Sequence, residues 1–221
     1  MEVRVEDEVL ERGLSFAYVE VDGVDPSADA GDLVERVTER LQERFDLEEL
    51  KDDPVVRAYR DYLWSIGIDP TKTRPAGEAL LRRALRGRFP RINAVVDSYN
   101  LASAEYRVPI SCFDRDALVG RLVIRPAREG ERMVDIAGEE VELSEDMVVL
   151  ADEEGPVSVS PYRDSRRTAV REDTERVLLV AHGAPGVEPE YLKEALERAV
   201  QYLKEGARAR ASGEVEVLAR G

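Results

Sequence analysis

Small polar and nucleophilic side chains interrupt an otherwise apolar stretch of the sequence, from Arg91 to Leu118. They are Asn93, Asp97, Ser98, Asn100, Ser103, Ser111, Cys112 and Asp114. Polar groups in a core cost free energy unless they are hydrogen-bonded or take part in function. A serine or cysteine becomes a nucleophile beside a base, whereas asparagine and aspartate also cap helices and satisfy loops. From the residue types alone, both roles stay open.

The chain has a single histidine, His182, and a single cysteine, Cys112. His182 follows a strand-like apolar run, so a pair with Ser111 or Ser165 is conceivable, although an isolated histidine is more often structural. One histidine and one cysteine are too few for a zinc site, and the lack of a disulfide partner fits a reducing compartment. The sequence has no phosphate-binding glycine loop and no Gly-x-Ser-x-Gly elbow. We expect neither a metal nor a cofactor.

A second polar segment, from Ser160 to Leu179, begins with a loop between two predicted strands. The loop carries Arg163, Asp164, Ser165 and Thr168. A polar loop of this kind is either solvated or lines a pocket, and its composition does not choose between them.

A basic cluster stands out from the acidic remainder of the chain. Between Pro70 and Arg91 there are seven basic residues and one acidic residue, although the whole chain has a net charge of −15. Arginine forks suit phosphate oxygens, so a polyanion contact is one interpretation. An arginine-rich helix neutralised by nearby carboxylates is the other. The residues we select as RNA-binding candidates are Lys72, Arg74, Arg82, Arg83 and Arg86.

Hydrophobic periodicity places these residues on helices and strands. Helices are predicted within 25–45, 53–67, 77–87 and 188–206, and a helix would also bring Asp97, Asn100 and Ser103 to one face. Strands are predicted at 14–24 and, from Leu122 onward, in the segments 121–127, 131–143, 146–161, 175–183 and 212–219. Helices come first and strands gather later, which favours the α+β class over a doubly wound sheet.

Composition limits the function classes. Charged residues make up 36%, against roughly 25% in ordinary domains, a surface typical of thermophilic proteins. An acidic chain disfavours indiscriminate nucleic-acid binding, although a local basic face remains compatible with it. No run approaches the ~20 apolar residues of a membrane span, and the acidic start is unlike a signal peptide. We expect a soluble, cytoplasmic protein with no membrane or DNA partner.

An ordered set of short motifs resembles a known family. The set spans about Ala79 to Ala181 and comprises Pro90–Asp97, Asn100, Pro109–Asp114, Gly120, Arg125, Ala127, Gly130–Glu131, Leu150–Asp152, Thr174 and Val177–Leu179. It resembles the tRNA-editing B3/B4 domain of the bacterial phenylalanyl-tRNA synthetase beta subunit. The upstream segments 57–60, 67–75 and 78–83 are similar to free-standing versions of this domain.

The resemblance implies a three-layer α+β fold with a β-sandwich core flanked by helices. It also implies one domain over residues 1–221, with a strand–helix extension over 1–50 and a core module over about 54–207. In the synthetase this domain hydrolyses tyrosine wrongly esterified to tRNA-Phe, with a positioned water. The implied partner is therefore a tRNA or the 3′ end of an aminoacyl-tRNA.

The residues carried over from the family only partly match. Asn100 corresponds to a pocket asparagine, whereas Tyr99 replaces a threonine and Ser111 replaces a histidine. Val180 replaces the glutamate that recognises the tyrosine hydroxyl, and 162–165 replaces a glycine-rich wall. Losing that glutamate removes the polar contact on which tyrosine selection depends, so Tyr-tRNA-Phe is not the expected substrate.

Three hypotheses remain open. The first is hydrolysis, in trans, of a different mischarged aminoacyl-tRNA; the second is a non-catalytic tRNA or aminoacyl-ligand binding module; the third is a small-metabolite protein that no longer binds RNA. For the first, the candidate catalytic residues are Ser111, Asp164 and Ser165. The candidate substrate pocket is Asn100, Tyr99, Cys112, Arg163, Thr168 and Val180. We expect Asp97 and Asp114 to serve the scaffold instead.

Overall fold

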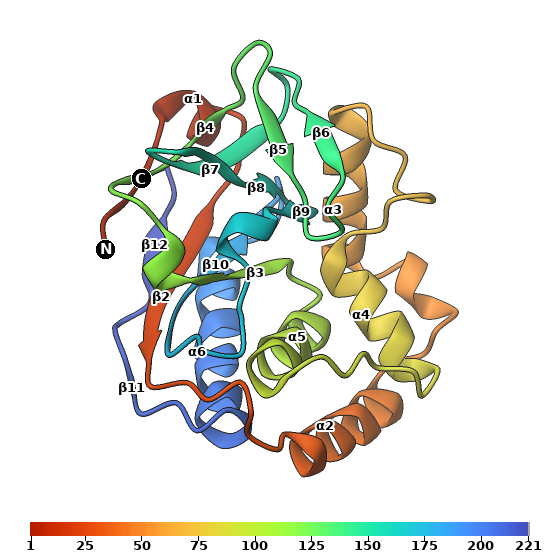
Figure 1. Cartoon of the computed structure of the whole chain (residues 1–221). Coiled ribbons are helices and arrows are strands. Elements are labelled where there is room, and N and C mark those ends of the chain that lie inside the picture. Colours follow the sequence, from red (N-terminus) through yellow and green to blue (C-terminus); the bar gives the residue numbers. More distant parts are fainter. Residues whose placement is uncertain (221) are drawn as a thin grey trace.

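Helices form one side of the protein, and two β-sheets form the other (Figure 1). The structure, a computed structural model, describes residues 1–220. Its helices are α1 (Asp7–Glu11), α2 (Gly31–Arg44), α3 (Pro54–Ser65), α4 (Ala76–Leu85), α5 (Ala94–Tyr106) and α6 (Pro189–Gly206), with short 3₁₀ helices η1 (Glu49–Lys51), η2 (Arg115–Ala117) and η3 (Arg166–Thr168). The helices predicted within 25–87 and 188–206 are confirmed, and the 91–118 stretch supplies α5 and a following strand. Helix α1, the three 3₁₀ helices and the strand at Val3–Val5 were not expected.

Local sequence signals explain where two of these helices begin. The Asp53 side chain accepts a hydrogen bond from the backbone N–H of Val56 at the start of α3, where Pro54 occupies the first helical position. At the start of α5, the Asn93 side chain accepts from the backbone N–H of Val96 in the same way. Asn93 is therefore a helix cap, one of the two roles left open by its sequence context.

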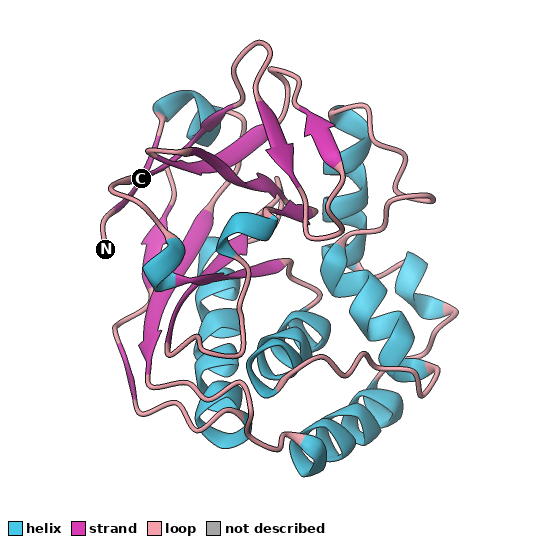
Figure 2. Ribbon diagram, in the orientation of Figure 1, coloured by secondary structure: helices cyan, strands magenta, loops and turns pink. Residues whose placement is uncertain are grey.

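The strands form two main sheets (Figure 2). The first, called the β4 sheet, has the order β1 (Val3–Val5), β4 (Leu122–Pro126), β7 (Val148–Asp152), β8 (Gly155–Ser160) and β9 (Arg163–Asp164). The second, called the β10 sheet, has the order β11 (Ala211–Ser212), β2 (Phe16–Asp22), β10 (Arg176–His182) and β3 (Ile110–Asp114), and β12 (Glu216–Leu218) also pairs with β2. A separate hairpin joins β5 (Arg132–Val134) to β6 (Glu140–Glu142).

The arrangement is a β-sandwich with helices on one side. Hydrogen bonds between side chains link the two sheets, from Ser111 on β3 to Asp164 on β9 and between His182 on β10 and Ser160 on β8. Helix α6 packs on β2 and β10, and α5 packs on β3 and on α6. The structure confirms the predicted α+β class, with three layers and a β-sandwich core flanked by helices. The first 50 residues contribute β1 and β2, which pair with strands of the core module.

Close contact between helices fixes the arginine-rich helix α4. A Cβ atom at Gly77 would lie 2.4 Å from the backbone carbonyl carbon of Arg107, just beyond α5. Only glycine permits this approach of α4 to the end of α5. Within residues 1–220, no helix has the length and apolar character needed to cross a membrane.

Candidate active site between the two sheets

Four polar side chains meet between the two sheets. Ser111 Oγ lies 2.7 Å from Asp164 Oδ1 and 2.8 Å from His182 Nε2, and the other ring nitrogen, Nδ1, lies 3.0 Å from Ser160 Oγ. We call Ser111, Asp164, His182 and Ser160 the Ser111 cluster. They come from four strands, β3, β9, β10 and β8, so neither sheet alone contains the arrangement.

The register of β3 against β10 brings Ser111 and His182 together. β3 and β10 pair antiparallel with Ser111 opposite Val180, and His182 lies two residues beyond Val180. Because side chains alternate along a strand, Val180 and His182 point to the same face, where Ser111 also points. The prediction that His182 could pair with Ser111 or with Ser165 is thus resolved in favour of Ser111.

The cluster is shielded from water, which changes its acid–base chemistry. Ser111, His182 and Ser160 are 5%, 2% and 1% exposed. Burial raises the pKa of the Asp164 carboxyl to about 6, although the hydrogen bond from Ser111 opposes the shift. Burial lowers the pKa of His182 to about 4. Near neutral pH the cluster therefore holds one carboxylate and one uncharged imidazole, a combination that can accept and pass protons.

Two of the predicted residues have other roles. The Ser165 hydroxyl accepts from the backbone N–H of Arg167 and caps η3, so the structure gives it a local structural role rather than a place beside Ser111. Arg163 forms an ion pair with Asp135 at 3.0 Å and lies over the Tyr162 ring. Arg163 and Ser165, the two sequence neighbours of Asp164, thus bond to residues outside the Ser111 cluster.

The remaining predicted pocket residues lie on α5, β3, β10 and η3. Asn100 and Tyr99 are partly buried on α5, and Cys112 is buried next to Ser111 on β3. Thr168 is fully buried, and its hydroxyl has no hydrogen-bond partner among the described residues. Val180 is fully buried and presents only an apolar side chain at the centre of β10.

Ser160 is the member of the cluster that the sequence analysis missed. A usable signal was present, because the run Pro156–Ser160 alternates apolar residues with Ser158 and Ser160. Alternation with period two places both serines on one face of β8, and both are buried. A buried polar stripe on a strand requires partners, but the sequence does not indicate that His182 is one of them.

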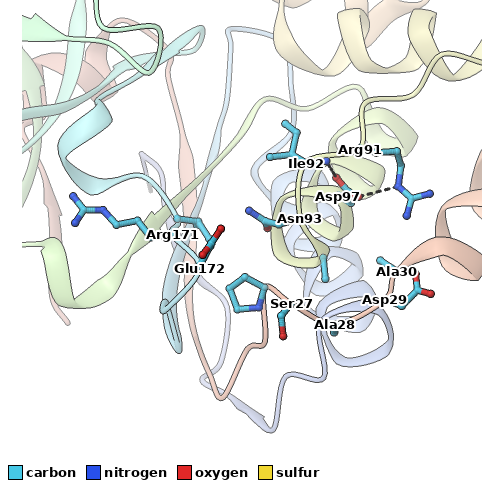
Figure 3. A pocket seen from close by; sticks show the side chains of 13 residues that line it. Ser27, Ala28, Asp29, Ala30, Arg91, Ile92, Asn93, Asp97, Arg171 and Glu172 are labelled. Atoms are coloured by element: carbon cyan, nitrogen blue, oxygen red, sulfur yellow. Dashed lines mark hydrogen bonds and ion pairs between the residues drawn. The ribbon is translucent and has the colours of Figure 1, made fainter.

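A wider hollow opens at the beginning of α5 (Figure 3). Its volume is about 720 Å³, and its walls come from the β2–α2 loop, the start of α5 and residues 170–172. Here Asp97 accepts from the Arg91 guanidinium and from the backbone N–H of Ile92, as Figure 3 indicates with dashed lines. Asp114 accepts from the Thr174 hydroxyl. The predicted scaffold roles of both aspartates are confirmed.

Comparison with known proteins decides the family. Residues 58–208 match the sequence profile of the B3/4 domain. The chain belongs to the B3/4 domain family. This B3/4 protein is 34% identical over 117 residues to the phenylalanine–tRNA ligase beta subunit of Carboxydothermus hydrogenoformans, covering 52% of this chain and 15% of that one. It is 35% identical over 88 residues to the Aquifex aeolicus beta subunit, covering 40% and 11%.

The family resemblance read from the sequence is therefore confirmed. The B3/4 chain spans only a small fraction of the length of the beta subunits that it matches. Among solved structures, it is similar to an N-terminal fragment of the phenylalanyl-tRNA synthetase beta subunit from Pyrococcus horikoshii. That similarity has a TM-score of 0.49 and 17% sequence identity, and covers 96% of this chain and 49% of that one.

The basic cluster of this B3/4 protein divides into paired and unpaired cations. Glu78, which is fully buried on α4, accepts hydrogen bonds from Arg60 at 2.8 and 2.5 Å and from Arg82 at 2.6 Å, and Arg74 lies 4.0 Å away. The half-buried Arg82 side chain is thus paired with Glu78. Lys72, Arg83 and Arg86 are exposed, and they line a hollow of about 370 Å³ with Arg74 and Arg82.

Proposed function

We propose that this B3/4 protein binds the aminoacylated 3′ end of a tRNA and hydrolyses the ester of a mischarged aminoacyl-tRNA other than Tyr-tRNA-Phe. The observation that carries the proposal is the Ser111 hydroxyl, which contacts a carboxylate and an imidazole together. A hydroxyl with a carboxylate acceptor within 3 Å and an imidazole beside it is an arrangement that ester cleavage can use, either as a nucleophile or to hold an attacking water.

The chemistry at this position differs from what the family resemblance implies. The resemblance aligns Ser111 with a histidine, and here the His182 imidazole, supplied by β10, lies 2.8 Å from the Ser111 hydroxyl. The imidazole and Asp164 supply acid–base groups that the loss of the aligned histidine had put in doubt. This supports retained hydrolysis over a binding module without catalysis.

The residue opposite Ser111, Val180, has no group that could accept a hydrogen bond from the phenol of an esterified tyrosine. A site that lacks the acceptor cannot favour tyrosine over phenylalanine by that contact. We therefore propose an ester of a different amino acid as the substrate.

Exposed cations supply a route to the tRNA backbone. Lys72, Arg83 and Arg86 project from the α3–α4 loop and from the end of α4, and no carboxylate within residues 1–220 forms an ion pair with them. Unpaired arginines can take phosphate oxygens in a bidentate fashion. RNA recognition based on an exposed 3′ end needs only a modest number of phosphate contacts, which is compatible with the net charge of −15.

The test is a deacylation assay on a panel of correctly and wrongly charged tRNAs. We expect ester loss from one mischarged species above the spontaneous rate, and a decrease on the order of 100-fold in Ser111→Ala. Ser65→Ala is the matched control, since its exposed hydroxyl bonds only the α3 backbone.

The alternative outcomes separate the competing functions. If no tRNA is deacylated faster than in buffer but tRNA binds with an affinity that falls with salt, the protein is a binding module and hydrolysis is wrong. If tRNA does not bind at all, the proposal fails as a whole, and a small metabolite becomes the ligand to seek.

A further inference from the structure

Ser111 is shared by two partners, yet its hydroxyl carries only one proton. Both Asp164 and His182 lie within hydrogen-bond distance of the same Oγ atom, at 2.7 and 2.8 Å. A serine hydroxyl donates once and accepts through its lone pairs. One of the two contacts must therefore be donated by Ser111 and the other must be accepted by it.

The charge of the Asp164 carboxylate determines which group donates in each of these hydrogen bonds. Ionised Asp164 can only accept, so the Ser111 O–H donates to Oδ1. The imidazole must then donate its Nε2–H to Ser111 Oγ. A neutral imidazole carries one N–H, which leaves Nδ1 as an acceptor for the Ser160 hydroxyl at 3.0 Å. One assignment satisfies all three contacts: Ser160 donates to His182, His182 to Ser111, and Ser111 to Asp164.

We infer that ionised Asp164, acting through Ser111, fixes the tautomer of His182, with Ser160 as the donor to Nδ1, and that Asp164, not His182, receives the proton of Ser111 when Ser111 reacts. In this tautomer the Nε2 lone pair is occupied by a proton, so the imidazole cannot act as the base toward Ser111. His182 instead donates a hydrogen bond to Ser111 Oγ. The order of groups thus differs from a serine–histidine–aspartate triad, in which the imidazole lies between the hydroxyl and the carboxylate.

The surroundings favour this assignment. The Phe16 ring meets the His182 ring edge-on at a centroid distance of 5.9 Å, and the Tyr59 hydroxyl on α3 donates to the His182 carbonyl, so ring and backbone are both held. Within residues 1–220, no lysine or arginine forms an ion pair with Asp164.

Other titratable groups near the cluster stay neutral over the same pH range. Burial raises the pKa of Tyr59, of Tyr99 on α5 and of Cys112 on β3 well above their usual values. Of the five groups Asp164, His182, Tyr59, Tyr99 and Cys112, Asp164 and His182 are therefore the two that change protonation below pH 7.

The reaction step that follows rests on the proposed function. The Ser111 oxygen forms a bond to the ester carbonyl carbon, its proton moves to Asp164 Oδ1, and the carbonyl electron pair moves onto the carbonyl oxygen. Collapse of this intermediate breaks the bond to the ribose oxygen, which leaves with the proton from Asp164. Water then attacks the acyl-serine and gives one proton to Asp164, which returns it to Ser111 as the amino acid departs.

Protonation of Asp164 reverses the whole chain. A carboxylic acid donates to Ser111, Ser111 then donates to Nε2, and the ring proton moves to Nδ1 to face Ser160. Acidification therefore exchanges one imidazole tautomer for the other before the ring itself becomes charged. This exchange is a direct signature of the inferred arrangement.

The experiment uses nitrogen NMR of the full chain labelled with ¹⁵N-histidine. His182 is the single histidine, so only one pair of ring signals arises. At pH 7.5 we expect the proton on Nε2, with a shift toward the Nδ1-protonated form as the pH falls through about 6. A ring with its proton on Nδ1 at pH 7.5 would overturn the inference, whether or not the protein is an esterase.

Substitutions separate positioning from general destabilisation. Ser111→Ala separates His182 from Asp164 and should mix the two tautomers at pH 7.5, whereas Ser111→Thr keeps the hydroxyl and should keep the Nε2-protonated form. The matched control is Ser98→Ala, because Ser98 is also a buried serine, whose hydroxyl bonds Ala94 on α5. An unchanged tautomer in Ser111→Ala would contradict the control of the tautomer by Asp164.

Kinetics test the base separately from the tautomer. With the ester found by the deacylation panel, we expect the rate to rise with pH around the titration of Asp164. Asp164→Asn should lower kcat on the order of 100-fold with little change in KM. A pH profile that follows the imidazole near pH 4 instead would assign the base to His182 and reject this part of the inference.

Discussion

Glu78 and Asp164 are two carboxylates withdrawn from water, and the protein treats them in opposite ways. Burial tends to raise the pKa of Glu78, but hydrogen bonds from Arg60 and Arg82 outweigh it and hold the pKa below its usual value. At Asp164 the partner is the Ser111 hydroxyl, with no arginine, and burial raises the pKa to about 6. The environments differ mainly in the charge of the hydrogen-bond donors.

The difference separates a structural carboxylate from one that we propose to be reactive. Glu78 is locked in its ionised form and holds α4 to α3 through Arg60. Asp164 lies near the point where a proton can be gained or lost at ordinary pH, which general acid–base chemistry requires. Because Glu78 binds Arg82, that arginine of the basic cluster is less available to a polyanion than the unpaired Arg83 and Arg86.

The largest expected effect follows from removing the charge of Glu78. Glu78→Gln leaves Arg60 and Arg82 without their shared carboxylate, and breaking a buried ion pair costs about 3 kcal/mol or more of unfolding free energy. Urea denaturation monitored by circular dichroism at pH 7.5 measures the loss. A change below about 1 kcal/mol would mean that Glu78 is not the structural member of the pair.

Asp164→Asn should change how stability depends on pH. The pKa of Asp164 in the folded protein, about 6, is above its ordinary value of 3.8, so the native state binds more protons between these values. This contribution to stability is fully present below pH 3.8 and is lost as the pH rises through 6. We expect the unfolding free energy of wild type, relative to Asp164→Asn, to fall by about 2–3 kcal/mol from pH 4 to pH 7.

The measurement is a series of urea titrations of both proteins between pH 4 and pH 7. His182, whose pKa is lowered to about 4, destabilises both proteins as the pH falls from 6.5 toward 4. Its effect therefore largely cancels in the difference. If the difference in unfolding free energy between the two proteins stays constant from pH 4 to pH 7, the pKa of Asp164 is not raised by burial.

The smallest effect concerns the unpaired cations. Replacing both Arg83 and Arg86 with glutamine should reduce the slope of log affinity against log salt for tRNA by about 1.5, since each lost phosphate contact removes roughly 0.7–0.9. The control is Arg121→Gln with Arg128→Gln, which removes the same charge from exposed positions flanking β4. Equal slopes for the two double variants would show that α4 does not contact phosphates.

Much of the fold was predictable because local rules govern it. The continuous apolar run from Val177 to Ala181 predicted β10, and the Asp53–Pro54 pair marked the start of α3. The motifs from Pro90 to Asp114 predicted the family, which the B3/4 match confirms. These signals lie within segments of a few to about 25 residues, so they can be recognised without knowledge of the tertiary structure.

Two sequence interpretations depended on partners that the sequence does not identify. Ser165 was as good a candidate as Ser111 by residue type, yet its hydroxyl caps η3. Arg82 resembled Arg83 as a phosphate ligand, yet it bonds Glu78 one helical turn earlier. In each case the side chain forms a hydrogen bond with a residue close to it in the sequence. Several alternative hydrogen bonds of this kind have similar energies, so the sequence does not show which one forms.

The sequence by itself determined most of the helices and strands, and the polar residues that a core must satisfy. Tertiary structure decided which of those residues meet. Ser111 and Asp164 are 53 positions apart, Ser111 and His182 are 71 apart, and their contacts require the register of β3 against β10 and the packing of one sheet on the other. Burial between the sheets, and not residue type, also sets the proton affinities of Asp164 and His182, because withdrawal from water acts on the assembled site alone.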